Sequence, residues 1–240
     1  MIEISHLVKK YGDHYAVKDL NVRIEEGQIY GFLGPNGAGK STTMNMITGY
    51  LAPTAGTVKV DGFDIVKEPE KAKEHIGYLP EIPPLYSEMT VEEYLKFAAE
   101  LKRIPRKERA AQIEKAIKTA QLEDVRKRLI NNLSKGYKQR VGLAQAVLGD
   151  PETIILDEPT DGLHLDDIRR LMKLFNRMTD QGNTLFIIEH SLDVMKDADY
   201  IVELGPGGGL AGGSLLFAGT PKEMLEAERS VTREYLRESL

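Results

Sequence analysis

Hydrophobic and polar positions follow two different periods along this chain. Residues 2–8 and 15–24 alternate apolar and polar side chains, which is typical of antiparallel strands with one buried face. Further strands are predicted from short apolar runs at 29–33, 57–60, 76–81, 153–157, 184–189, 199–204 and 214–218. We expect the glycine-rich stretch 205–213 to be a flexible loop between strands.

Helical spacing dominates the middle of the chain. Apolar residues from Val91 to Leu101 would share one helical face, and Thr90 with Glu93 would form a capping box at its start. Further helices are predicted at about 40–50, 66–75, 106–120, 135–149, 165–180, 220–228 and 230–238. The pattern therefore predicts an α/β chain with a helical insert over residues 90–140.

Composition narrows the class of protein. The chain has 240 residues, enough for a large core, and its net charge of −5 argues against gripping nucleic acid by phosphate neutralisation. It has no cysteine, which excludes disulfides, thiolate zinc sites and iron–sulfur clusters. We find no signal peptide and no apolar run near 18 residues, so we expect a cytoplasmic chain, docked at most on the inner face of the membrane.

Residues 34–42, Gly-Pro-Asn-Gly-Ala-Gly-Lys-Ser-Thr, match the phosphate-loop pattern G-x-x-x-x-G-K-[ST]. They follow a predicted strand and open a predicted helix, which is the context that the motif needs. Backbone N–H groups of such a loop cradle the β- and γ-phosphates, and the helix N-terminus adds positive charge. Lys40 supplies a point charge and Ser41 a hydroxyl for Mg²⁺. The motif predicts a nucleoside triphosphate site.

Acidic and basic side chains follow two other predicted strands. Asp157 ends an apolar strand and could hold Mg²⁺, while Glu158 could orient or deprotonate the attacking water. His190 follows strand 184–189 and could bond the γ-phosphate, although a histidine at a strand end is usually a polar cap. Tyr11 could stack on adenine or be an ordinary surface aromatic.

Ser134 and Gly136 lie at the start of the helix that precedes the acidic strand. A helix start is a phosphate-binding device, but one already serves the phosphates at residue 40. A second therefore suggests the nucleotide of a partner chain. An ordinary serine N-cap is the alternative for this segment taken alone.

The order of phosphate loop, Leu-Ser-Lys-Gly-Tyr-Lys-Gln signature, acidic strand and histidine resembles an ATP-binding cassette (ABC) nucleotide-binding domain. The resemblance implies the P-loop NTPase fold of ABC ATPases: a RecA-like core, an N-terminal antiparallel β subdomain and an inserted α-helical subdomain. It implies core regions at about 1–85 and 141–225, a helical subdomain at about 86–140 and a C-terminal helix at about 226–240. It also implies ATP and Mg²⁺ as cofactors and a head-to-tail homodimer that sandwiches two ATPs.

The resemblance assigns roles residue by residue. It implies nucleotide contacts by Tyr11, Val17, Asn36, Gly37, Gly39, Lys40, Ser41, Thr42, Ser134 and Gly136. It implies metal ligands at Ser41, Glu81 and Asp157, and catalysis by Glu158, His190 and Lys40. Glu81 stands where most cassettes have glutamine. Lys135 replaces the first glycine of the signature, where it could attract a partner's phosphate or, as we expect, be solvated.

Two families share the resemblance. Residues 1 to about 160 resemble the ATPase subunit of an ABC-2-type transporter, whereas 157–240 resemble the C-terminal part of UvrA, the damage-recognition ATPase of the bacterial excinuclease. The second likeness rests on Asp157-Glu-Pro-Thr-Asp-Gly-Leu-His, on the segment around His190 and on the glycines at 205–213. The hypothesis is a mosaic joined near 157–160, either an engineered chimera or a natural recombinant.

Three functions compete on this basis. A transport ATPase subunit is favoured, with residues 82–89 as the contact with transmembrane subunits. A DNA-repair-type ATPase is the alternative, although the chain lacks the zinc-binding cysteines and the DNA-binding insertion of UvrA, and nucleic acid is not an expected partner. The third is a folded chimera that binds nucleotide without a physiological partner.

Overall fold

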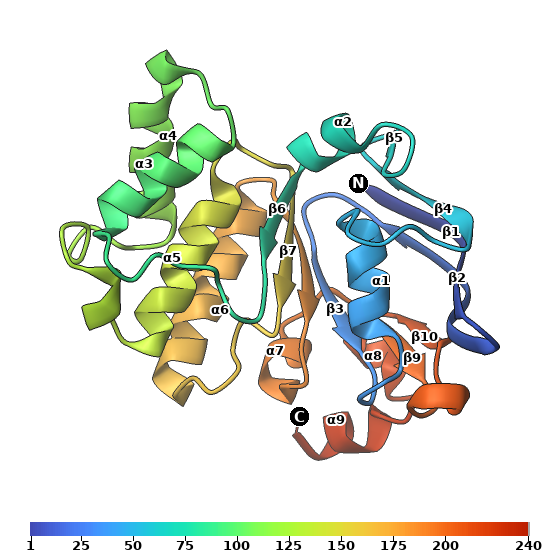
Figure 1. Ribbon diagram of the computed structural model, residues 1–240. Coiled ribbons are helices and arrows are strands. Elements are labelled where there is room, and N and C mark those ends of the chain that lie inside the picture. Colours follow the sequence, from blue (N-terminus) through green and yellow to red (C-terminus); the bar gives the residue numbers. More distant parts are fainter. Residues whose placement is uncertain (240) are drawn as a thin grey trace.

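The computed structural model describes residues 1–239. The strands form two sheets (Figure 1). The smaller sheet is antiparallel, in the order β2-β1-β4-β5, and consists of β1 (Ile2–Tyr11), β2 (His14–Ile24), β4 (Ala55–Val60) and β5 (Phe63–Asp64). It confirms the antiparallel N-terminal strands expected from the alternating pattern.

The larger sheet carries the order β10-β9-β3-β8-β7-β6. Its strands are β3 (Ile29–Leu33), β6 (Ile76–Leu79), β7 (Thr153–Asp157), β8 (Thr184–Ile188), β9 (Tyr200–Gly205) and β10 (Ser214–Gly219). All neighbours are parallel except β9 and β10. Parallel strands have their carboxyl ends at one edge, where ligands of open α/β sheets bind.

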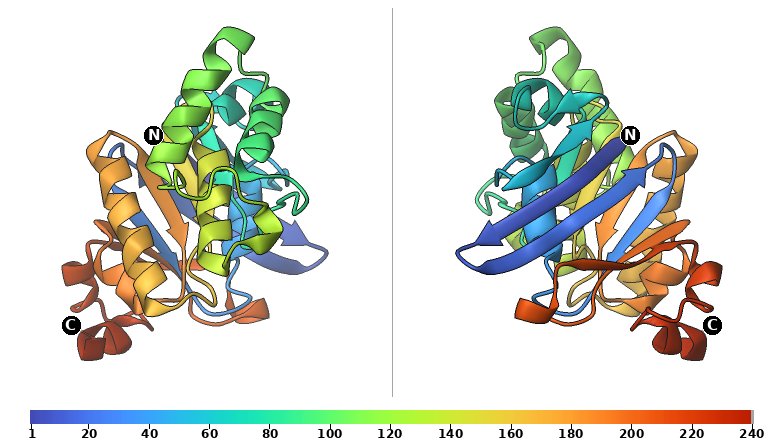
Figure 2. Two further views of the ribbon diagram at one scale, coloured as in Figure 1. Left: turned by 90° about the vertical axis from the view of Figure 1, so that its left-hand side faces the viewer. Right: turned by 90° about the vertical axis from the view of Figure 1, so that its right-hand side faces the viewer.

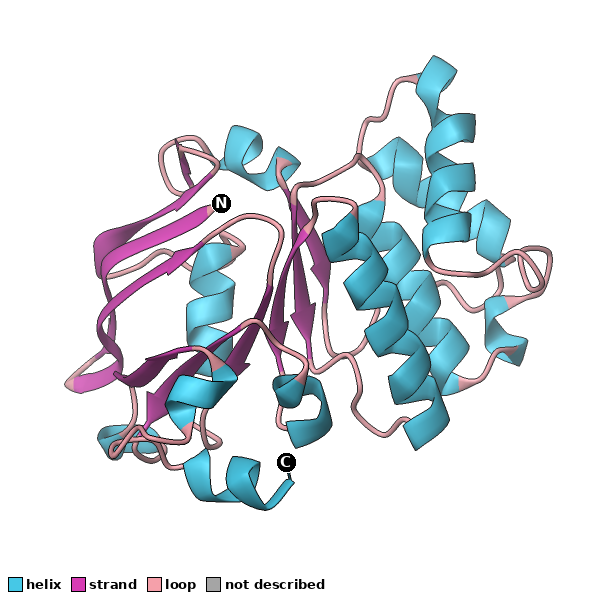
Figure 3. Cartoon of the chain, turned by 180° about the vertical axis from the view of Figure 1, so that it is seen from behind, coloured by secondary structure: helices cyan, strands magenta, loops and turns pink. Residues whose placement is uncertain are grey.

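Helices cover both faces of the larger sheet and extend beyond it (Figures 1 and 3). They are α1 (Lys40–Ile47), α2 (Pro69–Glu74), α3 (Val91–Leu101), α4 (Arg106–Thr119), α5 (Lys135–Val147), α6 (Leu165–Asp180), α7 (Leu192–Lys196), α8 (Pro221–Met224) and α9 (Arg233–Ser239). Short 3₁₀ turns occur at Ile130–Asn132 (η1) and Gly209–Ala211 (η2). No helix in residues 1–239 combines the length and apolar character needed to cross a bilayer.

Alternation along the central strands creates two separate cores. In β8, Phe186 and Ile188 join α1 and the smaller sheet in one cluster, whereas Leu185 and Ile187 join α6 and part of α5 in another. Successive side chains of a strand point to opposite faces, so α1 and α5 lie on opposite faces of the larger sheet. Figure 2 shows the long strands β1 and β2 on the side away from α6.

A third cluster packs α3, α4 and α5 together in the helical region. The predicted capping box is confirmed: Thr90 Oγ1 accepts from the Glu93 backbone N–H (3.3 Å), and Glu93 Oε2 accepts from the Thr90 N–H (2.8 Å). Helix α5 belongs to two clusters, because Val141 and Ala144 face the helical region while Leu143 faces the larger sheet.

Several predicted boundaries differ from the structure. The two C-terminal helices are shorter than predicted, and the last predicted position, residue 240, lies outside the described residues. The five-residue helix α7 was not predicted, because a helix of barely more than one turn leaves little periodicity in a sequence. It forms through tertiary packing, with Val194 and Met195 fully buried against the larger sheet.

Candidate functional site

The phosphate loop connects β3 with α1 at the carboxyl edge of the larger sheet. Gly39, the N-cap of α1, has φ = 100°, and a Cβ there would lie 2.3 Å from the carbonyl oxygen of Ala16. Glycine is therefore required by backbone conformation and by the close approach of β2, in addition to the room that phosphate needs. Among the other predicted contacts on this loop, Asn36, Gly37 and Ser41 are exposed and Thr42 is half-buried.

Lys40 opens α1 and is almost fully buried. Its ammonium donates to the carbonyl oxygens of Gly34 (2.6 Å) and Pro35 (3.3 Å), which hold it against the loop. Burial lowers the pKa of Lys40 below its usual value, while the charges of Glu158 and Asp157 act in the opposite direction. Lys40, Asp157 and Glu158 therefore share one electrostatic environment.

Asp157 ends β7 and accepts a hydrogen bond from the Tyr78 hydroxyl (3.4 Å). Burial raises the pKa of the Asp157 carboxyl, and the neighbouring charges of Glu158 and Glu81 raise it further. Burial of the Tyr78 hydroxyl, together with the nearby Asp157 carboxylate, raises the pKa of Tyr78 to about 12. This concentration of carboxylate charge fits a hard divalent cation such as Mg²⁺, which prefers oxygen ligands.

Glu158 follows directly with an unusual backbone. Its φ of 46° lies in the left-handed region, which costs a non-glycine residue about 1–3 kcal/mol and is found at functional sites. The Glu158 N–H donates to the Ile188 carbonyl at the end of β8 (2.9 Å), which holds this conformation. Its Oε1 lies 3.2 Å from Nε2 of His190, so the structure brings these two predicted residues together.

Glu189 immediately precedes His190 and was not predicted from the sequence as a site residue. Its buried carboxylate accepts from the N–H and the hydroxyl of Thr160, and from the N–H groups of His190 (3.0 Å) and Ser191 (3.2 Å). It ties the loop after Glu158 to the loop that carries His190. The only signal was an acid at the end of an otherwise apolar strand.

The signature segment begins α5. Ser134 caps the helix by accepting from the Tyr137 N–H (3.4 Å), so the capping role is present. Gly136 is buried against α6, where a Cβ would come within 2.9 Å of the Asp167 carboxylate. Lys135 is exposed, as expected, and its ammonium forms a surface ion pair with Asp161 (3.0 Å), whose side chain is also about half exposed.

Helix α5 starts at the same edge of the sheet as α1. Gly142 lies beside Leu79 and Ala146 beside Gly77, so α5 runs antiparallel to β6 and begins at the carboxyl edge. Since α1 and α5 lie on opposite faces of the sheet (Figure 1), the structure does not bring Ser134 to the phosphate loop of its own chain.

Two predicted nucleotide contacts lie on the smaller sheet. Tyr11 is half exposed at the end of β1, with the Lys9 ammonium 5.3 Å from its ring centroid. Val17 is fully buried, and its side chain packs 3.4 Å from the position a Cβ at Gly39 would take. Val17 thus packs against the phosphate loop. Contact of Tyr11 or Val17 with the nucleotide stays a prediction.

Comparison with known proteins agrees with this arrangement. The ABC transporter family model matches residues 17–161 of the chain. The chain belongs to the ABC transporter family. Its fold is accordingly the ABC ATPase fold, with the antiparallel sheet and helical region described above, and ATP hydrolysis is the reaction expected of it.

Curated ABC relatives match over most of this chain. It is 34% identical over 224 residues to "Probable multidrug ABC transporter ATP-binding protein YbhF" of Escherichia coli, covering 93% of the chain and 38% of YbhF. It is 33% identical to "ABC transporter ATP-binding protein NatA" of Bacillus subtilis, covering 92% of the chain and 88% of NatA. For "Bacitracin transport ATP-binding protein BcrA" of Bacillus licheniformis, identity is 37% over 80% of the chain and 62% of that protein. The chain thus spans less than two thirds of YbhF and BcrA.

Solved ABC structures superpose closely. An ATP-binding subunit of an ABC transporter gives a TM-score of 0.82 at 27% identity, with both chains covered completely. The cbiO1 protein of Clostridium perfringens gives 0.83 at 30% identity, covering 97% and 93%. The cassette MJ0796, in a dimeric post-hydrolysis state with ADP and phosphate, gives 0.77 at 26% identity, covering 92% and 98%.

The mosaic hypothesis receives no support from these comparisons. The matches to YbhF and NatA cover more than nine tenths of the ABC chain and so extend across the proposed junction at 157–160. His164, which suggested a second origin, caps α6 by accepting from the Asp166 N–H (3.4 Å). Such a helix-capping role requires no second parent family.

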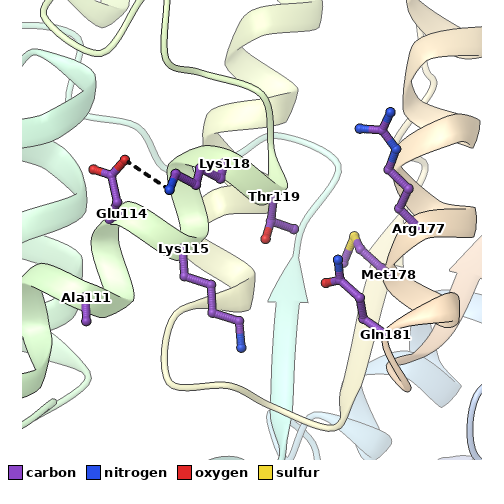
Figure 4. Close-up of a pocket in the computed structure, with 8 residues that line it drawn as sticks. All are labelled: Ala111, Glu114, Lys115, Lys118, Thr119, Arg177, Met178 and Gln181. Atoms are coloured by element: carbon purple, nitrogen blue, oxygen red, sulfur yellow. Dashed lines mark ion pairs between the residues drawn. The ribbon is translucent and has the colours of Figure 1, made fainter.

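A cavity of about 760 Å³ lies between α4 and α6 (Figure 4). Lys115, Lys118 and Arg177 line it, but among the described residues it contains none of the predicted site residues. Lys118 pairs there with Glu114 (4.0 Å). The predicted site residues therefore lie outside this cavity.

Asp157→Asn should stabilise the nucleotide-free chain at neutral pH. Because the folded chain disfavours ionised Asp157, the penalty exists above its raised folded pKa and vanishes below the unfolded value near 3.8. We expect Tm to rise by about 2 °C at pH 7 and the gain to shrink as the pH falls. Calorimetry against pH, with exposed Asp13→Asn as control, checks this; a lower Tm at pH 7 contradicts it.

Glu189→Gln should destabilise the chain. The amide nitrogen of glutamine cannot accept hydrogen bonds, so one pair of buried donors would lose its partner. We expect the free energy of unfolding to fall by about 2 kcal/mol. Urea denaturation measures it, with exposed Glu228→Gln as the control; equal stabilities would show that the bonds to Thr160, His190 and Ser191 contribute nothing.

Proposed function

We propose that this chain is the ATP-binding and ATP-hydrolysing subunit of an ABC-type transporter, and that it works as a head-to-tail homodimer. One observation carries the proposal: the Lys40 ammonium, the Asp157 carboxylate and the Glu158–His190 pair meet at one edge of the sheet. A buried cation beside ordered carboxylates and a phosphate loop suits phosphoryl transfer, in which placement and electrostatics supply most of the rate.

Each group has a role in that reaction. The loop amides and Lys40 bind the phosphates of ATP, with Tyr11 proposed for the adenine. Ser41, Asp157 and Glu81 would hold Mg²⁺, whose charge offsets that of the phosphates when it is bound. Glu158 takes a proton from the attacking water. His190 bonds the γ-phosphate and, through its 3.2 Å contact, fixes the carboxylate of Glu158.

The position of α5 supports the dimer. Its N-terminus, with Ser134 and Gly136, faces the same edge as the phosphate loop but lies across the sheet from it. A head-to-tail pair would set the α5 start of each protomer against the nucleotide of the other, where N–H groups and the helix dipole favour phosphate. The related cassette MJ0796 is described as a dimer.

The helical region is proposed to meet transmembrane subunits. Ile82 is 80% exposed and lines a groove of about 390 Å³ together with Glu81 and Lys135. Tyr86, 53% exposed, lines a second groove with Pro84 and Tyr94. Lone exposed apolar residues are ordinary, but a groove next to site residues suits a partner that senses nucleotide. The relative cbiO1 is described as part of the complex cbiONQ.

The proposal keeps the division into a core at 1–85 and 141–225, a helical unit at 86–140 and a terminal helix at 226–240. Helix α5 packs in both the helical and the central cluster, so movement at Ser134 would reach the groove. We place the chain at the cytoplasmic face of the membrane. Relatives named for bacitracin and multidrug transport suggest export of a small molecule chosen by the membrane subunits.

A complementation experiment tests the shared site. Lys40→Ala disables the phosphate loop and Ser134→Glu places negative charge at the helix start, so each variant alone should be inactive. Mixed dimers hold one intact site, and an equal mixture should recover about a quarter of the parental ATPase rate. The parental rate should also rise faster than linearly with protein concentration. A linear parental rate with no recovery on mixing would refute the dimer.

Glu158→Gln should separate binding from turnover. Glutamine keeps the shape of the side chain but cannot take the proton, so ATP affinity should persist while turnover falls by about a hundredfold or more. The same change should favour the closed dimer, seen by light scattering with ATP. Lys40→Ala is the contrast, since it should lose nucleotide binding. Parental turnover in Glu158→Gln would remove Glu158 from its role as base.

A further inference from the structure

The segment 205–213, called here the glycine-rich segment, connects β9 with β10 (orange in Figure 1). A flexible loop between strands was predicted here. In the structure the segment lies directly on the phosphate loop and is hydrogen-bonded to it. The Gly209 N–H donates to the Gly37 carbonyl (3.1 Å), and the Gly213 N–H donates to the Ala38 carbonyl (3.0 Å). Both acceptors belong to the nucleotide-binding motif.

These bonds supply hydrogen-bond donors to the carbonyl groups of Gly37 and Ala38 in the phosphate loop. When successive N–H groups of a loop turn toward phosphate, the carbonyl groups of the same peptides point outward and need other donors. Here the glycine-rich segment supplies donors to two consecutive carbonyls. Fixing a carbonyl also fixes the N–H of the next residue, since the peptide unit is planar.

Two glycines of the segment are explained by close backbone contacts and not by their own backbone conformation. Gly208 (φ −95°) and Gly212 (φ −86°) have backbone conformations that any residue adopts. A Cβ on Gly208 would lie 2.3 Å from the Asn36 carbonyl oxygen, and one on Gly212 would lie 2.9 Å from that of Gly37. The close approach of the phosphate loop therefore requires glycine at 208, whereas at 212 a Cβ would also lie 2.8 Å from the Gly207 carbonyl oxygen of the segment itself.

Strand β2 anchors the segment from the other side. The Lys18 N–H donates to the Gly213 carbonyl (2.6 Å), and the Lys18 ammonium donates to the Leu210 carbonyl (3.1 Å). The Gly212 N–H closes η2 onto the Gly209 carbonyl (3.0 Å). The segment is thus a braced turn between the smaller sheet and the phosphate loop.

We propose that the glycine-rich segment is a clamp that presets the phosphate loop in its nucleotide-binding shape. This inference rests on the proposed function, because its consequence is ATP affinity. A loop held by two backbone bonds loses less conformational freedom when phosphate binds, and preordering of this kind appears as affinity. Its residues are positioning residues, since they touch the loop and not the reacting atoms.

Gly208→Ala tests the clamp, with its neighbour Gly207→Ala as the matched control. A Cβ at Gly207 would meet only the Ala211 methyl, at 3.4 Å, which is an ordinary contact. We expect Gly208→Ala to raise KM and Kd for MgATP about tenfold while kcat stays within about twofold of the parent. Gly207→Ala should match the parent in all three, with thermal unfolding confirming that each variant is folded.

Lys18→Met is a second variant that adds no atom to the contact. It removes the bond to the Leu210 carbonyl while the backbone bonds remain, so we expect an increase in Kd of about twofold. Amide hydrogen exchange of residues 34–42 in the nucleotide-free chain measures how rigid the phosphate loop is without ATP. Exchange there should speed up in Gly208→Ala and Lys18→Met but not in Gly207→Ala.

The outcomes distinguish the two hypotheses. If the parent binds MgATP and all three variants bind it equally well, the clamp is wrong although the proposed function stands. Parental exchange rates in Gly208→Ala, or faster exchange with unchanged Kd, also overturn it. If the parent fails to bind MgATP, the proposed function fails and takes with it the claimed effect on affinity.

Discussion

The parallel register of β3, β8 and β7 is the constraint on which the site depends. Phe32 pairs with Ile188, and Ile188 pairs with Asp157, so the three strands end in line. Whatever follows each strand is delivered to one edge: the phosphate loop, the Glu189–His190 turn and Glu158. The hydrogen bonds between the parallel strands therefore bring these three segments together without any rearrangement of the loops.

Secondary contacts then hold these parts at fixed relative positions. The Ile188 carbonyl holds the strained backbone of Glu158, and Glu189 joins the segments on either side of the Glu158–His190 contact. The glycine-rich segment supports the phosphate loop in a comparable way. Both supports use hydrogen bonds between segments remote in sequence, which suits a site where small displacements of charged groups change the rate.

Much of the fold followed from local patterns. The alternating N-terminal strands, the helix beginning at Thr90 and the strand leading to Asp157 were predicted because periodicity and capping chemistry act over a few residues. Helix α7 and the bond between Glu189 and Thr160 were not predicted, since each depends on a neighbour from another part of the chain. The ion pair between the exposed Lys135 and Asp161 was not predicted for the same reason, because Asp161 is 26 residues away.

The sequence alone determined which chemical groups this protein offers: a phosphate-loop motif, two acids at a strand end and a histidine after the next strand. These are local choices of residue and spacing, and they survive inspection of the structure. Tertiary structure alone decided which groups meet, on which face each helix N-terminus lies, and why glycine occupies 208 and 212. Those answers depend on distances between segments brought together only by packing and by the strand order of the sheet.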